Sequence, residues 1–582
     1  MIAPVRIVLL LTVACLPISA QTSRSAIERA LPVLAKSAAT FVEKRACFSC
    51  HHNTLPILTL HMAQERGFSI DTAALGAVEA KTFVTLLGPK ALDDAIQAVN
   101  LNDPTPDDSM LLMAAGAAGL QGDLTNEVLA RRLARWQRDG HWVTSDFRPP
   151  HSSSTFTATA TAIRAIAFYM PPELSAERDA VFARARTWLT TTKPQSTEDA
   201  SFRLMGLAWS HAPSAELGAA RRDLLAMQKT GGGWGQTADY PGDAYSTGEA
   251  LYALHESGTA STEPAWRRGE KFLIDTQAAD GTWHVATRMI SPADVSPRYF
   301  STGFPYEHDE YLSYAGTCWA VMALVSSLPD RTGSHMEPKP DRAAPWLRTA
   351  LFGTTAQLQS LLDSGVDPNT LLIPSAHDPE KVKLLLARGA DATFEALTVA
   401  TAYRDTAASV EALLAAGAPP EPPSGIRVKH SPLVLAASTG DLATLKLLLA
   451  HGADPSAASQ SNTPIATAIM FGYPEIVRAL IKAGANAKIT ESTGINLMHW
   501  ATITGHAEII PVLAEAKVPI NAVDDNGFTP LMYAATIDFG GTALVDELLK
   551  AGANRTVKND DGRTPLEQAL FYHHERLAAA LR

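Results

Sequence analysis

The sequence predicts an all-α protein that consists of two different arrays of helical repeats. Two observations predict this class. In the first half of the chain, helical runs end repeatedly in Gln and then Gly-x-Trp, and in the second half, units open with Ser-Pro or Thr-Pro and close with Gly-Ala-Asp or Gly-Ala-Asn. A chain of 582 residues also exceeds what a single hydrophobic core organises, so two or more domains are expected.

The bulk composition is that of a globular protein with an acidic balance. Hydrophobic residues make up 46% of the chain and charged residues 19%, and the formal net charge is −11. No basic run stands out, which argues against a nucleic acid as a partner.

Residues 1–20 are expected to be a secretory signal peptide. Arg6 supplies a positive charge, residues 7–16 form a short apolar stretch, and Ser19-Ala20 are small residues that suit cleavage. No later segment is long and apolar enough to span a membrane. The mature chain is therefore expected to be exported to a bacterial periplasm, with no transmembrane span.

The next feature is the segment Cys47-Phe48-Ser49-Cys50-His51, which has the C-x-x-C-H pattern of c-type haem attachment. Two thiols three residues apart can add to the two vinyl groups of one porphyrin, and His51 then lies under the iron as its proximal ligand. Export fits this interpretation, because bacteria attach haem covalently outside the cytoplasmic membrane. The motif predicts one covalent haem c on Cys47 and Cys50.

Two other chemistries fit the same residues. Cys47 and Cys50 could form a redox-active or structural disulfide. They could also bind zinc with His51 or His52, although a fourth zinc ligand is not identifiable.

A haem iron also needs a sixth ligand. The candidates are His61 and Met62 on the next predicted helix. A Met ligand would raise the reduction potential relative to a second His. His52 is adjacent to the proximal ligand and is not expected to reach the other face of the same iron.

Tryptophan marks the first repeat array. Eight of the ten tryptophans lie between Trp136 and Trp319, and the repeat pattern occurs at residues 137–142, 222–234 and 268–283. Each copy ends a helix with Gln and a Gly turn, because Gly takes the left-handed conformation that terminates helices. The Trp can then fold back over the helix end and bury its large face. Short helices rich in small residues are expected to follow, at 153–169, 197–209, 245–257 and 314–328.

This pattern resembles the QW repeat of squalene–hopene cyclases and related prenyltransferase-like α/α toroids. The resemblance covers residues 25–330, and the copy at 268–283 is the most specific. It implies that residues 21–328 form a ring of helical hairpins, each with an outer and an inner helix, around a central cavity. The C-x-x-C-H motif lies between a predicted outer helix at 26–45 and a predicted inner helix at 54–64, where other units carry the Gln and Trp turn.

The resemblance also suggests an enzyme. Squalene–hopene cyclases protonate their substrate with the middle acid of D-x-D-D, and the nearest match here, Thr105-Pro106-Asp107-Asp108, lacks the first Asp. Asp107 and Asp108 are therefore weak catalytic candidates, and the alternative is that they stabilise a helix start. Protein prenyltransferases of this fold use an Asp, Cys and His set on zinc. Cys318 lacks such partners and is expected to be a buried small residue.

Residues 329–344 are expected to be a linker, because prolines, a glycine and several charges occur together there. A second repeat follows, with 32 residues from Pro432 to Pro464 and 32 from Gly452 to Gly484. Ser or Thr at the N-cap followed by Pro marks a helix start in four units, at Pro432, Pro464, Pro530 and Pro565, and the unit near Asn496 lacks this start.

This second array resembles ankyrin repeats, whose period is about 33 residues. The resemblance covers residues 345–582 and implies seven or eight units, of which those before Pro420 are degenerate. Ankyrin arrays bind proteins through a concave face.

Together these features predict an exported c-type haem protein for electron transfer or redox sensing, rather than an enzyme with turnover. Its ankyrin repeats are expected to bind a protein partner, while its redox partner is not identifiable from the sequence. Two alternatives stay open. One is a terpene-cyclase-like or other enzyme that uses the ring cavity, and the other is a pure protein-binding scaffold.

Overall fold

A computed structural model describes residues 22–45, 50–99, 103, 107–289, 301–329, 344–423, 428–459 and 462–582. The expected signal segment at 1–20, Cys47 and most of the expected linker at 329–344 lie outside these residues. The regular elements within the described ranges are all helices, in agreement with the predicted all-α class. In this part of the chain, no helix has both the length and the apolar character that crossing a membrane requires.

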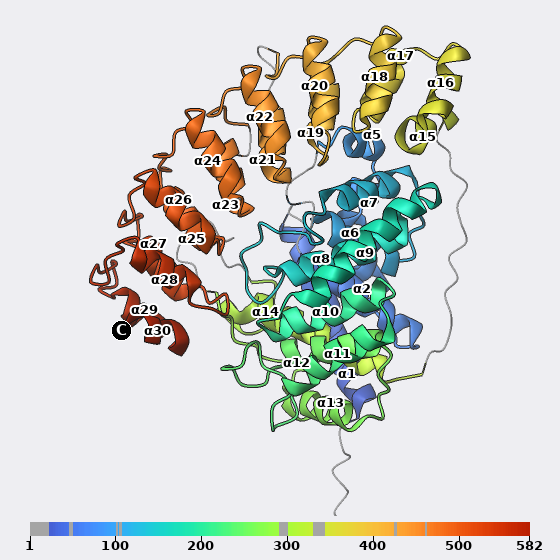
Figure 1. The fold of residues 1–582 in the computed structure, drawn as a ribbon. Coiled ribbons are helices and arrows are strands. Elements are labelled where there is room, and N and C mark those ends of the chain that lie inside the picture. The colour runs from blue at the N-terminus through green and yellow to red at the C-terminus, as the bar shows by residue number, and fades with distance from the viewer. Residues whose placement is uncertain are drawn as a thin grey trace, which may run out of the picture.

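Six helices form a closed ring in the N-terminal half (Figure 1). Each contacts the next one along the chain, and the last, α14, contacts the first, α2. The ring helices are α2 (Leu55–Glu65), α6 (Ser109–Ala117), α8 (Thr155–Tyr169), α10 (Thr197–Trp209), α12 (Ala244–Glu256) and α14 (Glu310–Ser326).

The other helices of this half pack around the ring from outside. Each precedes an inner helix, so the chain alternates between the two layers. The outer helices are α1 (Ser23–Lys44), α7 (Leu124–Trp136), α9 (Ser175–Thr191), α11 (Ser214–Ala226) and α13 (Pro264–Thr276). Between α2 and α6, three short helices take the place of one outer helix: α3 (Thr72–Thr82), α4 (Val84–Leu87) and α5 (Ala91–Ile96).

The observed helices lie close to the expected ones. The outer helix expected at 26–45 is Ser23–Lys44, and the inner helix expected at 54–64 is Leu55–Glu65. The last inner helix begins at Glu310, four residues before the expected start. The small residues of the inner helices serve close packing, since a Cβ added at Gly248 of α12 would lie 2.5 Å from the α14 backbone.

The recurring Trp residues hold the outer helices to the ring, as predicted. Trp142, Trp234 and Trp283 are buried. Each indole Nε1 donates to a carbonyl of the preceding outer helix, at 2.7, 2.8 and 2.8 Å. Each Trp backbone N–H bonds to a Thr hydroxyl of the following inner helix.

The recurring Gln residues join neighbouring hairpins. Gln228 Nε2, after α11, donates to the Ala265 carbonyl of α13 at 2.9 Å. Gln277 Nε2, after α13, donates to the Ala26 carbonyl of α1 at 2.8 Å, across 251 residues of sequence. Because α1 also contacts α13 and α14, this hydrogen bond lies where the outer layer closes.

The C-terminal half is an array of eight helix pairs in the described residues (Figure 1). Seven or eight units were expected. The pairs are α15 (Pro345–Phe352) with α16 (Thr355–Asp363), α17 (Pro368–Ser375) with α18 (Pro379–Ala387), α19 (Phe394–Thr401) with α20 (Ala407–Ala415), α21 (Pro432–Thr439) with α22 (Leu442–Ala450), α23 (Pro464–Met470) with α24 (Pro474–Lys482), α25 (Leu497–Ile503) with α26 (Ile510–Glu515), α27 (Pro530–Thr536) with α28 (Ala543–Lys550), and α29 (Pro565–Phe571) with α30 (Glu575–Leu581).

The predicted Ser-Pro and Thr-Pro starts are N-caps. The side chains of Ser431, Thr463, Thr529 and Thr564 each accept a hydrogen bond from the backbone N–H three residues later. In the unit of α25, which lacks this start, Asn496 is the cap and accepts from two backbone N–H groups. A side-chain acceptor satisfies N–H groups that have no partner inside the helix.

The array curves around one side of the ring and contacts it from its first unit to its last (Figure 1). In the first unit, Arg348 forms an ion pair with Glu127 at 2.7 Å. In the third unit, the Ala402 carbonyl accepts a hydrogen bond from Trp136 Nε1 at 2.9 Å. In the last unit, Arg576 forms an ion pair with Asp239 at 2.7 Å. These contacts are joined by others of the same kind. One side of the array is therefore occupied by the protein's own ring.

Candidate functional site

The candidate site lies at the end of the ring where the inner helices begin. His51 belongs to a single π-helical turn, η1 (Cys50–Thr54), which leads into α2. His151 precedes α8, and Tyr311 is in the first turn of α14. The centre of the His51 ring is 6.2 Å from that of His151 and 5.8 Å from that of Tyr311. Three segments that are distant in sequence thus bring aromatic side chains together.

His52 is part of the protein core. Its ring stacks between Phe41 of α1, at 4.8 Å, and Tyr314 of α14, at 4.0 Å between centres. Its Nε2 lies 3.4 Å from the Ser37 hydroxyl, and its Nδ1 contacts Nδ1 of His51. Burial lowers the pKa of His52 to about 3, so the ring is neutral. His52 thus holds the π-helical turn against α1 and α14.

His51 is partly exposed and is fixed from one side. Its hydrogen-bonding contact within the described residues is through Nδ1, to His52. The pKa of His51 lies well below its ordinary value, first because of burial and then because of the nearby His52, His151 and Arg148. His51 is therefore a neutral imidazole, which is the form that binds metals.

His151 is buried, with 4% of its surface exposed. Its Nδ1 lies 3.1 Å from the Tyr245 hydroxyl, which donates to Oε2 of Glu198 at 2.7 Å. Its Nε2 is buried and has no hydrogen-bond partner in the described part of the chain. Burial lowers the pKa of His151 to about 4. When Glu198 is ionised it can only accept, so the Tyr245 proton points to Glu198 and Nδ1 of His151 carries the other proton.

A buried pair of acids lies behind this hydrogen bond. Glu198 of α10 accepts from Thr157 at 2.6 Å and from Tyr245, whereas both carboxyl oxygens of Glu249 on α12 are buried without a hydrogen-bond partner among the described residues. Burial raises the pKa of Glu198 to about 7, and burial and Glu198 raise that of Glu249 well above its ordinary value. At neutral pH the pair therefore retains a proton.

The structure places the remaining predicted haem residues as follows. Cys47 and the side chain of Cys50 lie outside the described residues. His61 pairs with Glu79 of α3 at 2.6 Å, and Met62 is partly buried against the core. His61 is six residues into the helix that follows the turn, about 9 Å along its axis, so the structure does not bring it next to His51.

The two weak catalytic candidates are held differently. Asp108 is buried and forms a 2.7 Å ion pair with Arg132 of α7. It makes no side-chain cap to α6, so the helix-start role is not seen there. Asp107 lines a cavity between the ring and the array, with a volume of about 280 Å³, and burial raises its pKa to about 8. Thr105 and Pro106 of the matched segment lie outside the described residues.

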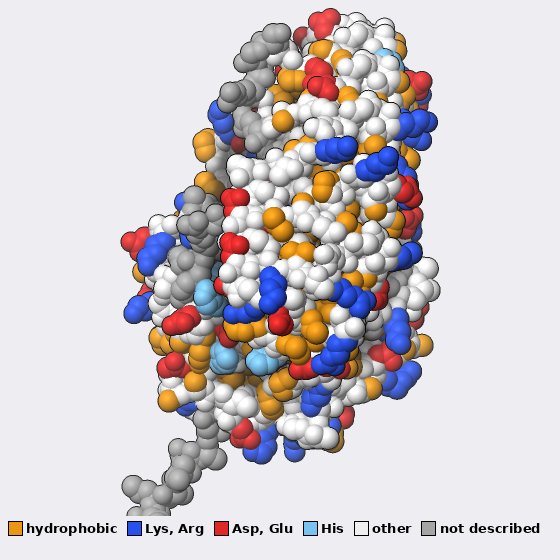
Figure 2. Space-filling model, turned by 90° about the vertical axis from the view of Figure 1, so that its left-hand side faces the viewer, with side chains coloured by type: hydrophobic (Ala, Val, Ile, Leu, Met, Phe, Trp, Pro, Cys, Tyr) orange, Lys and Arg blue, Asp and Glu red, His pale blue; other side chains and the backbone are white. Residues whose placement is uncertain are grey.

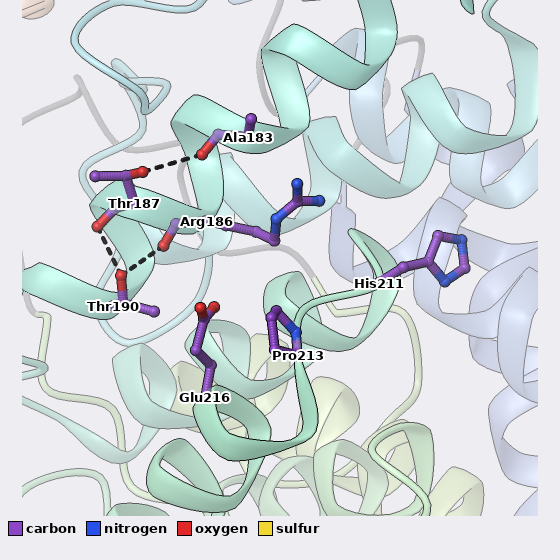
Figure 3. A pocket seen from close by; sticks show the side chains of 7 residues that line it. All are labelled: Ala183, Arg186, Thr187, Thr190, His211, Pro213 and Glu216. Atoms are coloured by element: carbon purple, nitrogen blue, oxygen red, sulfur yellow. Dashed lines mark hydrogen bonds between the residues drawn. The ribbon is translucent and has the colours of Figure 1, made fainter.

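A second cavity, of about 320 Å³, lies on the outer layer between α9 and α11. The hydroxyls of Thr187 and Thr190 bond to carbonyls of their own helix (Figure 3). Arg186 donates to the Ser210 carbonyl at 2.6 Å. Thr187, Thr190 and Arg186 thus serve the helices themselves, whereas the buried Oε2 of Glu216 has no hydrogen-bond partner among the described residues.

The described residues contain no group of three or more His, Cys, Asp and Glu side chains that could hold a metal ion on their own. Cys318 on α14 is buried and unpaired with another cysteine, as expected of a small core residue, and burial raises its pKa to about 12.

Sequence comparisons concern the second half of the chain. Three overlapping copies of the family model for ankyrin repeats match residues 397–491, 466–559 and 498–582. Ankyrin repeat and KH domain-containing protein mask-1 of Caenorhabditis elegans is 35% identical over 209 residues, 33% of this chain and 7% of that protein. Palmitoyltransferase AKR1 of Lachancea kluyveri is 33% identical over 109 residues, 18% of this chain and 14% of its own.

The Escherichia coli protein YahD, whose name describes ankyrin repeats, is 27% identical over 186 residues, which make up 25% of this chain and 92% of YahD. By contrast, the chain spans less than a fifth of the length of mask-1 and AKR1. The similarity therefore lies in the repeats. Residues 397–582 are ankyrin repeats, and the helix pairs before them continue the same array.

Proposed function

We propose that the protein is a scaffold whose ankyrin array recognises a protein partner. The observation that carries this proposal is the array of eight helix pairs, most of which match the ankyrin family model. Ankyrin arrays are a general protein-binding architecture because stacked units form one extended surface. Since one side of the array holds the ring, the partner binds to the turns that link successive units.

These turns form a regular row. Backbone N–H groups of Asp391, Asp454 and Asn554 donate to side chains of the preceding unit at 2.8–2.9 Å, which ties each turn to its neighbour. Basic and acidic side chains are both scattered over the face in Figure 2. Such a surface suits a protein partner of mixed charge.

Site-specific photo-crosslinking tests this proposal. A crosslinker is placed at the exposed Val523, in a turn of the array, and, as a matched control, at the exposed Lys271 on the outer layer of the ring. We expect a discrete crosslinked protein from position 523 and none from position 271. The same pattern from both positions, or none from either, contradicts the proposal.

A second function is favoured by the site at the ring. We propose that the N-terminal half carries one haem c, attached through Cys47 and Cys50, with His51 as an iron ligand, and that the protein serves electron transfer or redox sensing after export. Neutral His51, held through Nδ1 and partly exposed, suits metal ligation. Nearby, the buried Nε2 of His151 has no hydrogen-bond partner among the described residues, which also suits a metal or cofactor at this site. A bound haem would supply one-electron redox chemistry.

Haem staining of the denatured full chain, produced with a cytochrome c maturation system, tests this second function. The wild type is expected to retain haem through denaturation, and Cys47→Ala with Cys50→Ala to lose it. Cys318→Ala is the matched control and is expected to retain the stain, since Cys318 is remote from the motif in sequence and buried in the core. An unstained wild type, or a stained double variant, rules out covalent haem.

A further inference from the structure

The pair of His51 and His151 has the spacing of two ligands on opposite sides of one metal. Their ring centres are 6.2 Å apart, and the ring planes are inclined by 67°. An imidazole nitrogen lies about 2 Å from a metal that it binds, and about 1 Å from its own ring centre, so two axial imidazoles place their ring centres roughly 6 Å apart. The observed separation matches this value.

Both rings are held through Nδ1, which leaves Nε2 for a metal. His51 is engaged through Nδ1, by His52, and His151 is engaged through Nδ1, by the Tyr245 hydroxyl. In both, Nε2 is the nitrogen that has no hydrogen-bond partner within the described residues, and in His151 it is fully buried. A buried nitrogen without a partner is costly, and a bound metal removes this cost. Hydrogen bonds to Nδ1 are the usual way in which proteins orient a ligating His.

The segment that carries His151 is rigid. The Ser152 hydroxyl donates to Oδ2 of Asp146 at 2.6 Å, and the Arg148 backbone N–H donates to Oδ1 of the same residue at 3.1 Å. Tyr245, which contacts His151, is itself fixed by Glu198. A ligand that is positioned before the metal arrives gives a defined geometry without further ordering.

We propose that His151 is the second axial ligand of the haem iron, opposite His51. This inference rests on the proposed haem function and names the sixth ligand of that site. It replaces His61 and Met62 as the candidates, since His61 is held by Glu79 and Met62 packs against the hydrophobic core. The haem is therefore coordinated by two histidines from the first and third hairpins of the ring.

Two consequences follow from this coordination. With both axial positions filled by imidazole, the iron is six-coordinate and low-spin, and small external ligands compete poorly for it. Two His ligands also give a lower reduction potential than a His and Met pair. The site then favours electron transfer over ligand binding.

The test uses the full chain loaded by the maturation system, with absorption and electron paramagnetic resonance spectra as readouts. We expect a low-spin wild type. We expect His151→Ala to keep its covalent haem, to become high-spin and to gain binding of added imidazole by at least tenfold. His151→Met, which restores a ligand, is expected to be low-spin again with a raised midpoint potential. The matched controls Met62→Leu and His61→Gln are expected to keep the wild-type spectrum.

The outcomes separate the two proposals. A wild type without stainable haem ends the haem function, and with it the assignment of His151. A stained His151→Ala variant that stays low-spin, or a Met62→Leu variant that becomes high-spin, overturns the assignment of His151 and leaves the haem function standing. Should His151→Ala fail to fold, the midpoint potential of His151→Met decides, because an unchanged potential excludes His151 as a ligand.

Discussion

Glu198 and Glu249 are two acids that are buried in the ring and share their surroundings, and the pKa of each is raised by burial. The folded-state pKa of Glu198 is about 7, against an ordinary value of 4.5. A raised pKa means that the contribution of the pair to stability is complete below pH 4.5 and is lost as the pH rises through 7.

The first prediction is that Glu249→Gln flattens this dependence. The amide removes one of the two acids, so the variant should gain stability relative to the wild type at pH 8, on the order of 2 kcal/mol, and little at pH 4. Urea unfolding between pH 4 and 8 measures both profiles. Glu28→Gln, at an exposed position of α1, is the control and should follow the wild type. If the free energy of unfolding of Glu249→Gln and of the wild type changed with pH in parallel, the pH dependence would not come from this pair of acids.

The second prediction concerns Asp108. Its removal leaves the buried Arg132 without its ion-pair partner, so we expect Asp108→Ala to lower the free energy of unfolding by about 3–5 kcal/mol. Asp179→Ala removes the exposed partner of Arg178 and should cost less than about 1 kcal/mol. Chemical denaturation of both variants checks the difference. Equal, small losses would mean that Asp108 is not held by Arg132 and would restore it as a catalytic candidate.

Among elements, the closure between α13 and α1 differs from the other junctions of the ring because it joins the beginning of the chain to a helix far along it. The third prediction is that Gln277→Ala increases amide hydrogen exchange throughout α1, because this helix loses the hydrogen bonds that Gln277 forms with Ala26 and Arg29. Gln228→Ala removes the same type of bond between α11 and α13 and serves as the control. Exchange in α1 that rises equally in both variants contradicts a special role of this closure.

The elements themselves were largely predictable from local sequence. The Gln and Trp turns, and the Ser-Pro and Thr-Pro caps, act over a few residues, so their effect is visible without knowing the fold. The helix pairs before residue 397 were the weakest prediction, because their turns depart from the repeat pattern. That part of the array contacts the ring, for example through the hydrogen bond between Arg131 and His377, and such contacts are not visible in the local sequence.

The residues of the proposed haem site could be predicted from the sequence only in part. Cys47, Cys50 and His51 are adjacent in sequence and form a recognisable spacing. His151 lies 100 residues after His51 and precedes an ordinary inner helix, so nothing nearby distinguishes it. What brings the two together is the ring, in which the inner helices start at the same end. The sequence therefore favours His61 and Met62 on the neighbouring helix, and the proximity of His151 to His51 is visible only in the fold.

At the scale of the whole molecule, the ring and the array share a long seam. Buried side chains of both halves belong to one continuous hydrophobic core. Trp136 at the end of α7 joins the halves directly, through its bond to the Ala402 carbonyl and its packing on Phe471. The array was expected to present its surface to another protein, and it first binds its own N-terminal half.

The fourth prediction tests this coupling. Trp136→Phe removes the hydrogen bond and keeps most of the packing area, so we expect a loss of about 1 kcal/mol and faster hydrogen exchange on both sides of the seam, in α7 and in α19. Trp266→Phe is the matched control, since its buried Nε1 has no hydrogen-bond partner in the described residues. Faster exchange in α7 alone would show that the halves are stabilised separately.

The bond from Gln277 to Ala26 also sets an order in time. A chain is made from its N-terminus at roughly 5–20 residues per second, so α1 is complete well before the residue that fastens it has been added. Over this interval α1 lacks its neighbour α13, and the outer layer is open at this position. The last hairpin therefore completes the outer layer, and the beginning of the chain is fastened only when the end of the ring has been added.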